Sequence, residues 1–495
     1  MEKRVLALTL LSTLALALLA GCGGNATTQS SEPTPPNPLS SDNVNLIFVA
    51  SQDLAFGVPG EMNPTTANLT DQGLQRALLT ATFLQQTVLG MQNVTAIYAL
   101  EPMTHPQTAN HYPDMVGLET IEQFAMINQI TLSSNQYGAG PLAAYSYPIH
   151  ASYSLGSLPG GVPVPDPLCA NCQGIDFADQ HGDNEALVTG ILHANVPGFY
   201  VVSAPWETVS RLMTNINRSE GYNLALPASY ISPNFIYAMA ITTSGSGSLF
   251  TYDSHITPSA TYPVLSPPVA SGGCTQQVPP FSVTVTGGQN GTIVPAGANT
   301  NETLYFIRHA DAHPTGYWND NNYIAAGQWR ALDLPNALAG KVSPLQVYSI
   351  DPAQAGPGSI EFTTGDHTFS SVAPALTAMP YAIANNLPYN LVTGFQLSDS
   401  NVDTETANFF FSGGKFSNQS VLVAWAYQFI QPTIHTLLEN YHATPQQLAQ
   451  LATWPPGDYD TIWTIQLDAV GNVTVSNGSC EGISSKALPS TPPRF

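Results

Sequence analysis

The same order of apolar and amphipathic segments occurs twice along the chain, and this internal repeat limits the folds available to it. In each half an apolar strand leads to an amphipathic helix and then to a second apolar strand. The two predicted helices share three residue types at identical spacing: Gly73 and Gly327, Arg76 and Arg330, Ala77 and Ala331. Strand, helix and strand in this order form the crossover unit of a parallel sheet, so the sequence predicts an α/β protein with two tandem domains.

Later segments extend the match between the halves. A buried strand is expected at 198–202 and again at 420–424, and a closing hairpin at 236–252 and again at 462–475. Each domain should therefore contain a largely parallel sheet closed by a β-hairpin.

The predicted domain boundaries follow from composition. We expect the first domain over residues 44–256 and the second over residues 300–480. Residues 257–299 are rich in Ser, Thr, Pro and Gly and are predicted to be a linker, with a small hairpin from Phe281 to Val294. Residues 481–495 are expected to form a tail.

The N-terminus has the features of an export signal. Basic residues precede an uncharged apolar stretch that ends in Leu19-Ala20-Gly21-Cys22, which resembles the lipobox of bacterial lipoproteins. The resemblance implies a signal peptide over residues 1–21, acylation of Cys22, and a flexible tether over residues 22–43. We therefore expect a lipid-anchored, extracytoplasmic protein of the bacterial cell envelope; an ordinary secretory signal is the alternative, and the choice between inner and outer membrane stays open.

The charge of the chain restricts its partners. Eleven Lys and Arg stand against 33 Asp and Glu, for a formal net charge of −22. Nucleic-acid binding depends on basic side chains, so nucleic acid is excluded as a partner.

The cysteines beyond Cys22 are Cys169, Cys172, Cys274 and Cys480. An even number in an oxidising compartment predicts disulfides, although sequence does not choose among the three pairings. The Cys169/Cys172 pair could instead be redox-active or hold zinc with His181. A second such pair is missing for a structural zinc site, so we predict neither a metal site nor a cofactor.

Arg308 and His309 directly follow the apolar run Leu304–Ile307, at the expected C-terminal end of a buried strand. Ligands bind at such strand ends in open α/β sheets, and a guanidinium beside an imidazole suits phosphate capture and nucleophilic attack. A surface pair without a role is the alternative.

The second half resembles the histidine phosphatase superfamily, the phosphoglycerate mutase-like proteins. The resemblance rests on the order strand, Arg308-His309-Ala310-Asp311, the helix with Gly327, Arg330 and Ala331, and the strand leading to Asp351-Pro352. It implies two three-layer α/β/α domains and a reaction through a phosphohistidine, with His309 as nucleophile and Arg308 as phosphate ligand. The resemblance extends to the first half only through the internal repeat and the overall order of elements.

The sequence departs from the family pattern at two further positions. Ala373 stands where the resemblance calls for a second arginine, and Tyr427 where it calls for a second histidine. Neither residue supplies a positive charge at neutral pH. In the first half Ser51-Gln52-Asp53 replaces the Arg-His pair, so that half is expected to be inactive as a phosphohistidine enzyme.

Other residues are candidates for supporting roles. Asp311, Asp366 and His367 are candidate acid–base groups if the site is active, although solvated loop residues are the simpler interpretation. Arg330 could replace the missing arginine, but its counterpart Arg76 favours a structural role.

We therefore expect a largely degenerate phosphatase, anchored to a membrane through Cys22, with a binding or scaffolding role and a small phosphorylated ligand. One alternative is an active phosphomonoesterase acting through His309. A purely structural envelope protein is the second alternative.

Overall fold

A computed structural model of the chain describes residues 38–128, 131–132, 142–143, 146–153, 158–162, 173–275, 277–288, 291–312, 321–354 and 370–495. Cys22 and the predicted signal and tether, the Cys169/Cys172 pair, Asp366 and His367 lie outside the described residues, so those predictions stay open. In the described part, no helix combines the length and the apolar character needed to span a membrane.

The first sheet has six strands in the order β5-β2-β6-β1-β7-β8. They are β1 Val44–Ser51, β2 Ala96–Ala99, β5 Ile149–His150, β6 Gly198–Pro205, β7 Phe235–Ile241 and β8 Gly247–Asp253. The strands from β5 to β1 pair in parallel, and the hairpin β7–β8 joins β1 antiparallel. A separate short pair, β3 Thr131–Leu132 and β4 Leu142–Ala143, lies outside this sheet.

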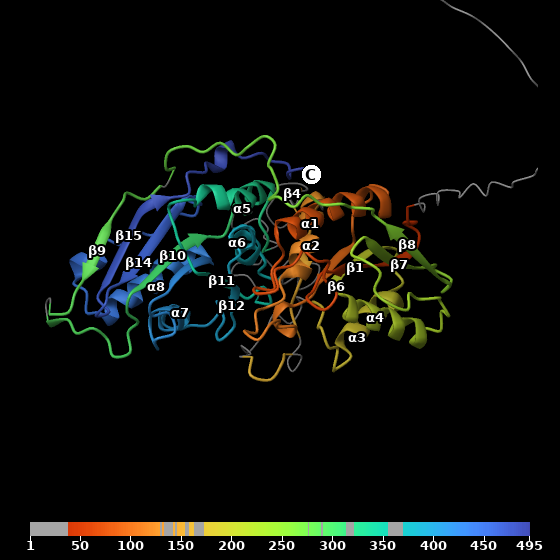
Figure 1. Cartoon of the computed structure of the whole chain (residues 1–495), viewed down its shortest axis with the longest axis horizontal. Helices are drawn as coiled ribbons and strands as arrows, with labels where there is room; N and C mark the ends of the chain where they lie inside the picture. Colours follow the sequence, from red (N-terminus) through yellow and green to blue (C-terminus); the bar gives the residue numbers. More distant parts are fainter. Residues whose placement is uncertain are drawn as a thin grey trace, which may run out of the picture. The chain divides into compact units, whose positions relative to one another are not determined.

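The second sheet repeats this order as β12-β11-β13-β10-β14-β15, with β9 added at the edge. Its strands are β9 Ser282–Val285, β10 Glu302–Arg308, β11 Gln346–Ile350, β12 Tyr389–Val392, β13 Ser420–Trp425, β14 Thr461–Leu467 and β15 Val473–Cys480. Parallel and antiparallel pairings match those of the first sheet position by position. The predicted fold of two α/β sheets, each closed by a hairpin, is confirmed (Figure 1).

Helices cover both faces of each sheet. The first sheet carries α1 Asp71–Phe83 and α2 Val116–Ile127 on one face, and α3 Asp183–Ala194 and α4 Trp206–Ser219 on the other. The second carries α5 Ala325–Ala337 and α6 Ala373–Ala384 on one face, and α7 Val402–Phe411 and α8 Tyr427–Asn440, followed by the short α9 Pro445–Leu448, on the other. Each half is thus a three-layer α/β/α arrangement.

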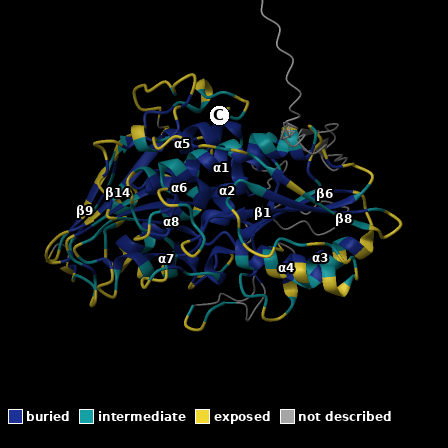
Figure 2. Ribbon diagram, turned by 45° about the vertical axis from the view of Figure 1, so that its right-hand side comes forward, coloured by how far each residue is buried: buried dark blue, intermediate teal, exposed yellow. Residues whose placement is uncertain are grey.

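The two halves share their central core. Apolar side chains of α1 and α2 from the first half and of α5 and α6 from the second belong to one continuous buried cluster. Figure 2 shows these helices buried in the interior, whereas α3 and α4 carry exposed residues. Residues 36–495 accordingly form one compact unit.

The repeated glycine is explained by a close backbone approach. A Cβ atom on Gly73 would collide with the carbonyl oxygen of Glu61, and one on Gly327 would collide with that of Asp311. The N–H groups of Thr70 and Ile324 donate to the same two carbonyl oxygens, at 3.0 and 2.8 Å. Each half therefore needs glycine where a loop crosses the first turn of its helix.

Residues 257–299 differ from a free linker in two ways. Cys274 forms a disulfide with Cys480 at the end of β15, which selects one pairing among the cysteines that the structure describes. Among the described residues of the hairpin predicted from Phe281 to Val294, the first arm is strand β9, and its partner in the sheet is β15, with which it pairs antiparallel. Because Val283 and Val285 can bury their side chains only on the sheet's apolar face, pairing with β15 is favoured over a hairpin exposed to water.

Candidate active site at the end of strand β10

Arg308 is the last residue of β10 and His309 follows it, as the sequence predicted. Arg308 pairs with Trp425, the last residue of the parallel strand β13, and the N–H of His309 donates to the Trp425 carbonyl oxygen at 3.0 Å. The pair therefore lies at the C-terminal edge of two central strands, where α/β sheets place their ligand sites.

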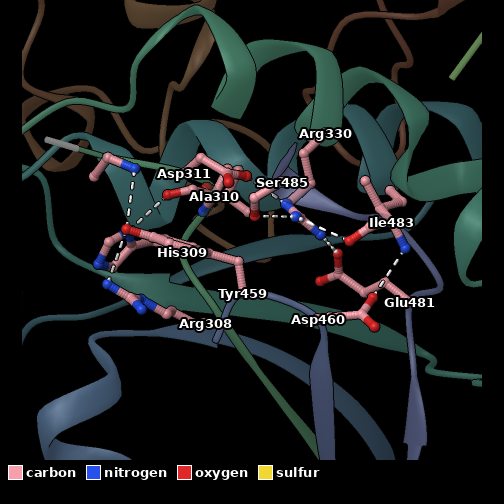
Figure 3. Close-up of polar contacts among 12 residues, drawn as sticks. Arg308, His309, Ala310, Asp311, Arg330, Tyr459, Asp460, Glu481, Ile483 and Ser485 are labelled. Atoms are coloured by element: carbon pink, nitrogen blue, oxygen red, sulfur yellow. Dashed lines mark hydrogen bonds and ion pairs between the residues drawn. The ribbon is translucent and has the colours of Figure 1, made fainter. Parts of the chain in front are cut away.

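The guanidinium of Arg308 is enclosed by protein groups on both faces. Its central carbon lies 4.1 Å from the ring centre of Tyr427 and 3.7 Å from that of Tyr459. One terminal nitrogen donates to the carbonyl oxygens of Pro456 and Asp458. The other donates to the Tyr459 hydroxyl at 3.1 Å (Figure 3). Burial lowers the pKa of Arg308, yet arginine stays charged at any physiological pH. Both faces and both terminal nitrogens of this cation are thus engaged within the protein, whereas Nε is buried without a hydrogen-bond partner among the described residues.

His309 is neutral and has a defined tautomer. Nδ1 lies 2.9 Å from the carbonyl oxygen of Ala310, which can only accept, so Nδ1 carries the proton and Nε2 keeps its lone pair. Burial, followed by the neighbouring Arg308 guanidinium, lowers the pKa of His309 well below its usual value. An unprotonated Nε2 is the form required of a histidine nucleophile.

Arg330 does not serve as a spare phosphate ligand. Its guanidinium lies 2.5 Å from Asp311 and 2.6 Å from Glu481, and also donates to the Ser485 hydroxyl and the Ile483 carbonyl oxygen (Figure 3). The Arg330 side chain is 1% exposed. The geometry favours a structural role for Arg330 and for Asp311, which sequence reasoning had also considered as an acid–base group.

The positions of the expected second arginine and second histidine lie beside this site. Ala373 begins α6, and its carbonyl oxygen accepts from Thr377, whose hydroxyl oxygen in turn accepts from the Ala310 N–H. Tyr427 begins α8 and stacks on Arg308. Neither position supplies a positive charge, and the structure describes neither Asp366 nor His367.

The corresponding edge of the first sheet holds acidic groups that sequence reasoning missed. Asp53 and Glu207 each lie two residues beyond the paired strand ends Ser51 and Pro205, and burial together with the nearby Asp53 carboxyl raises the pKa of Glu207 to about 7. His105 lies 2.8 Å from Asp114 next to this pair. The first sheet therefore has carboxyl groups where the second sheet has Arg308 and His309, and such an acidic edge is unsuited to phosphate binding.

No protein family model matches the sequence, and no curated protein matches it. Among solved structures, the chain is similar to SixA from Agrobacterium tumefaciens, by its name a phosphohistidine phosphatase, with 14% identity over 35% of this chain and 95% of that one and a TM-score of 0.23. A mycobacterial glucosyl-3-phosphoglycerate phosphatase with inorganic phosphate matches at 13% identity over 37% of this chain and all of that one, with a TM-score of 0.22. SixA from Nakamurella multipartitia matches at 17% identity, 41% and 96% coverage and a TM-score of 0.21. Overlaps of this size establish no common function, and the assignment of function depends on the site itself.

Proposed function

We propose that this chain is a catalytically silent protein of the histidine phosphatase superfamily, which keeps a binding or scaffolding role. The enclosure of Arg308 between Tyr427 and Tyr459 is the observation that carries this proposal. A guanidinium binds phosphate most strongly through two parallel N–H groups. Here both terminal nitrogens of Arg308 donate to protein carbonyl and hydroxyl oxygens, and Nε is the donor left without a partner among the described residues.

The loss of several charged groups explains the expected lack of turnover. Phosphoryl transfer depends on cations that neutralise the charge of the transferred group, and removing one such donor commonly costs about 3 kcal/mol in the barrier. Ala373 and Tyr427 supply no cation, and Arg330 is held by two carboxylates. Because groups that act as one unit fail together, turnover at ordinary enzyme rates is not expected.

We further propose that the two halves are diverged copies of one ancestral domain. The shared strand order supports this, as does a feature beyond the strands: Arg76 pairs with Glu61 and Arg330 with Asp311, the very residues whose carbonyl oxygens face the repeated glycines. The position of Glu61 was not recognisable from sequence, because the loop before it has a different length in the two halves.

The anchor at Cys22 is also a proposal, supported by the Leu19–Cys22 motif and the basic and apolar leader. It places the protein outside the cytoplasm and on a bacterial membrane. Mass spectrometry of the mature N-terminus should find a diacylglyceryl-modified Cys22; an unmodified N-terminus beyond Cys22 excludes the anchor.

The phosphomonoesterase alternative is favoured by one observation, the neutral His309 with its lone pair on Nε2. Turnover of p-nitrophenyl phosphate by the purified protein separates the two proposals. We expect equal inertness of wild type, His309→Ala and the control His435→Ala, which changes a partly exposed histidine far along the chain. Turnover of roughly 1 per second or more that His309→Ala alone abolishes would establish the enzyme instead.

A further inference from the structure

The contact between the two halves, which we call the seam, is formed by α1 and α2 on one side and α5 and α6 on the other. Nearly every residue of α2 and α6 is buried, although both helices lie at the border between two sheets. Water therefore has little access to the groups in the seam, and any charge there is poorly solvated.

Four carboxyl groups nevertheless lie in or beside the seam: Glu101, Glu119, Glu122 and Asp351. Glu101 follows β2 of the first half and Asp351 follows β11 of the second, at matching places in the repeat, and both are 0% exposed. Glu119 and Glu122 are on α2 and are 6% and 4% exposed. Within the described residues, no Lys or Arg forms an ion pair with any of the four.

The carboxyl groups of Glu101 and Asp351 interact with each other across the seam. Neither Glu101 oxygen has a hydrogen-bond donor among the described residues, nor does Asp351 Oδ2. Two ionised carboxylates would repel each other at this poorly solvated place, so the pair favours the state that holds at least one proton. The backbone N–H of Ala353 donates to Asp351 Oδ1 at 2.9 Å, which favours a single negative charge on Asp351. A second charge would be repelled at short range in a poorly solvated site.

The surroundings of the other two carboxyl groups are also uncharged. Glu122 accepts from the Gln328 amide at 2.9 Å and from the Tyr323 hydroxyl. Further titratable neighbours are tyrosines, which stay neutral below pH 10: Tyr153 near Glu101 and Asp351, and Tyr262, Tyr323 and Tyr389 near Glu119. Burial raises the pKa of Glu119 to about 8 and of Glu122 to about 7, and it raises that of Glu101 well above its usual value.

We propose that the seam is a proton-dependent lock: it holds the halves together while the Glu101–Asp351 pair and its neighbours keep their protons, and it loosens when they are lost. The folded chain then binds more protons than the unfolded chain over the pH range between the ordinary and the raised pKa values. Stability contributed by these groups is fully present at about pH 4.5 and below, and it is lost as the pH rises toward 8. Each such group changes the unfolding constant by up to about tenfold per pH unit in that range.

Urea unfolding of the described unit at pH 5, 6, 7 and 8 tests the lock, with hydrogen exchange of α2 and α6 as a local readout. Wild type should become less stable and exchange faster in these helices as the pH rises. The double variant Glu101→Gln/Asp351→Asn imitates the protonated pair. From pH 5 to pH 8 the increase in its unfolding constant should be smaller than the increase in wild type by a factor of about ten or more. Asp42→Asn removes a charge at an exposed position and should keep the wild-type dependence.

A pH dependence of the double variant equal to that of wild type overturns the proposal, as does faster exchange spread evenly over all helices. If the double variant fails to fold, infrared spectroscopy of the wild type decides. Protonated carboxyl bands that persist at pH 7 and disappear together with α2 and α6 protection support the lock, whereas their absence at pH 7 refutes it.

Discussion

Replacing Arg330 by Met should destabilise the fold rather than abolish a reaction. The change leaves Asp311 and Glu481 buried without their cation, at side-chain exposures of 5% and 1%, so water screens little of the loss. Removing one partner of a buried ion pair costs about 3–5 kcal/mol, and one arginine serving two carboxylates at 2.5 and 2.6 Å falls in this range. For a unit of roughly 460 residues the entropy of unfolding near the midpoint is about 1 kcal/mol/K, so the melting temperature should fall by about 4 °C.

Calorimetric melts at pH 7 and pH 5 measure this effect. The fall in melting temperature caused by Arg330→Met should be smaller at pH 5. Burial already raises the pKa of Glu481 to about 7, and removal of Arg330 favours the protonated form of Glu481 further. Adding Asp311→Asn and Glu481→Gln to the variant should recover part of the stability. The matched change Arg76→Met, which uncovers the single carboxylate of Glu61, should cost less. An unchanged melting temperature in Arg330→Met, combined with weaker phosphate binding, would refute the structural role and make Arg330 a ligand cation.

Two further variants test other features of the fold. Gly327→Ala should destabilise the protein by more than about 1 kcal/mol in urea unfolding, because its methyl group would collide with the Asp311 carbonyl oxygen. The control Gly190→Ala, on the open side of α3, should stabilise the protein by about 0.5–1 kcal/mol. Equal effects of the two variants would remove the explanation for the repeated glycine. Glu302→Gln should raise the free energy of unfolding by on the order of 3 kcal/mol at pH 8 and by much less at pH 5. Burial raises the pKa of Glu302 to about 8, so the wild type loses the stability contributed by the protonated Glu302 as the pH rises from 4.5. A gain that is equal at both pH values would contradict a buried, protonated Glu302.

Element order and the position of the Arg308–His309 pair were predictable from sequence because they depend on local patterns. Apolar strands and amphipathic helices are visible within ten to fifteen residues, and the end of a strand fixes which residues reach the sheet edge. The interactions that decide the chemistry of the site were not local. Tyr459 lies 151 residues after its partner Arg308, and Glu481 lies 151 residues after its partner Arg330. No short motif in the sequence points to either partner.

The same distinction explains why the partner of β9 and the acidic groups of the first half were not predicted from sequence. The alternating residues of β9 suit any antiparallel partner, and only the sheet edge at β15 determines which one is used. The carboxyl pair of Asp53 and Glu207 arises because two parallel strands end in register, a relation between residues that are remote in sequence.

The shared central core bears on how such a repeat can evolve. A single domain with the first-half sequence would expose to water the apolar residues of α1 and α2 that now contact the second half. Such a fragment would aggregate or associate with a second copy of itself. Under the duplication proposed above, substitutions on either side of the border would be selected for fit to the other copy. In such a repeat either half could lose its chemistry and still be retained, because it covers apolar surface of the other half.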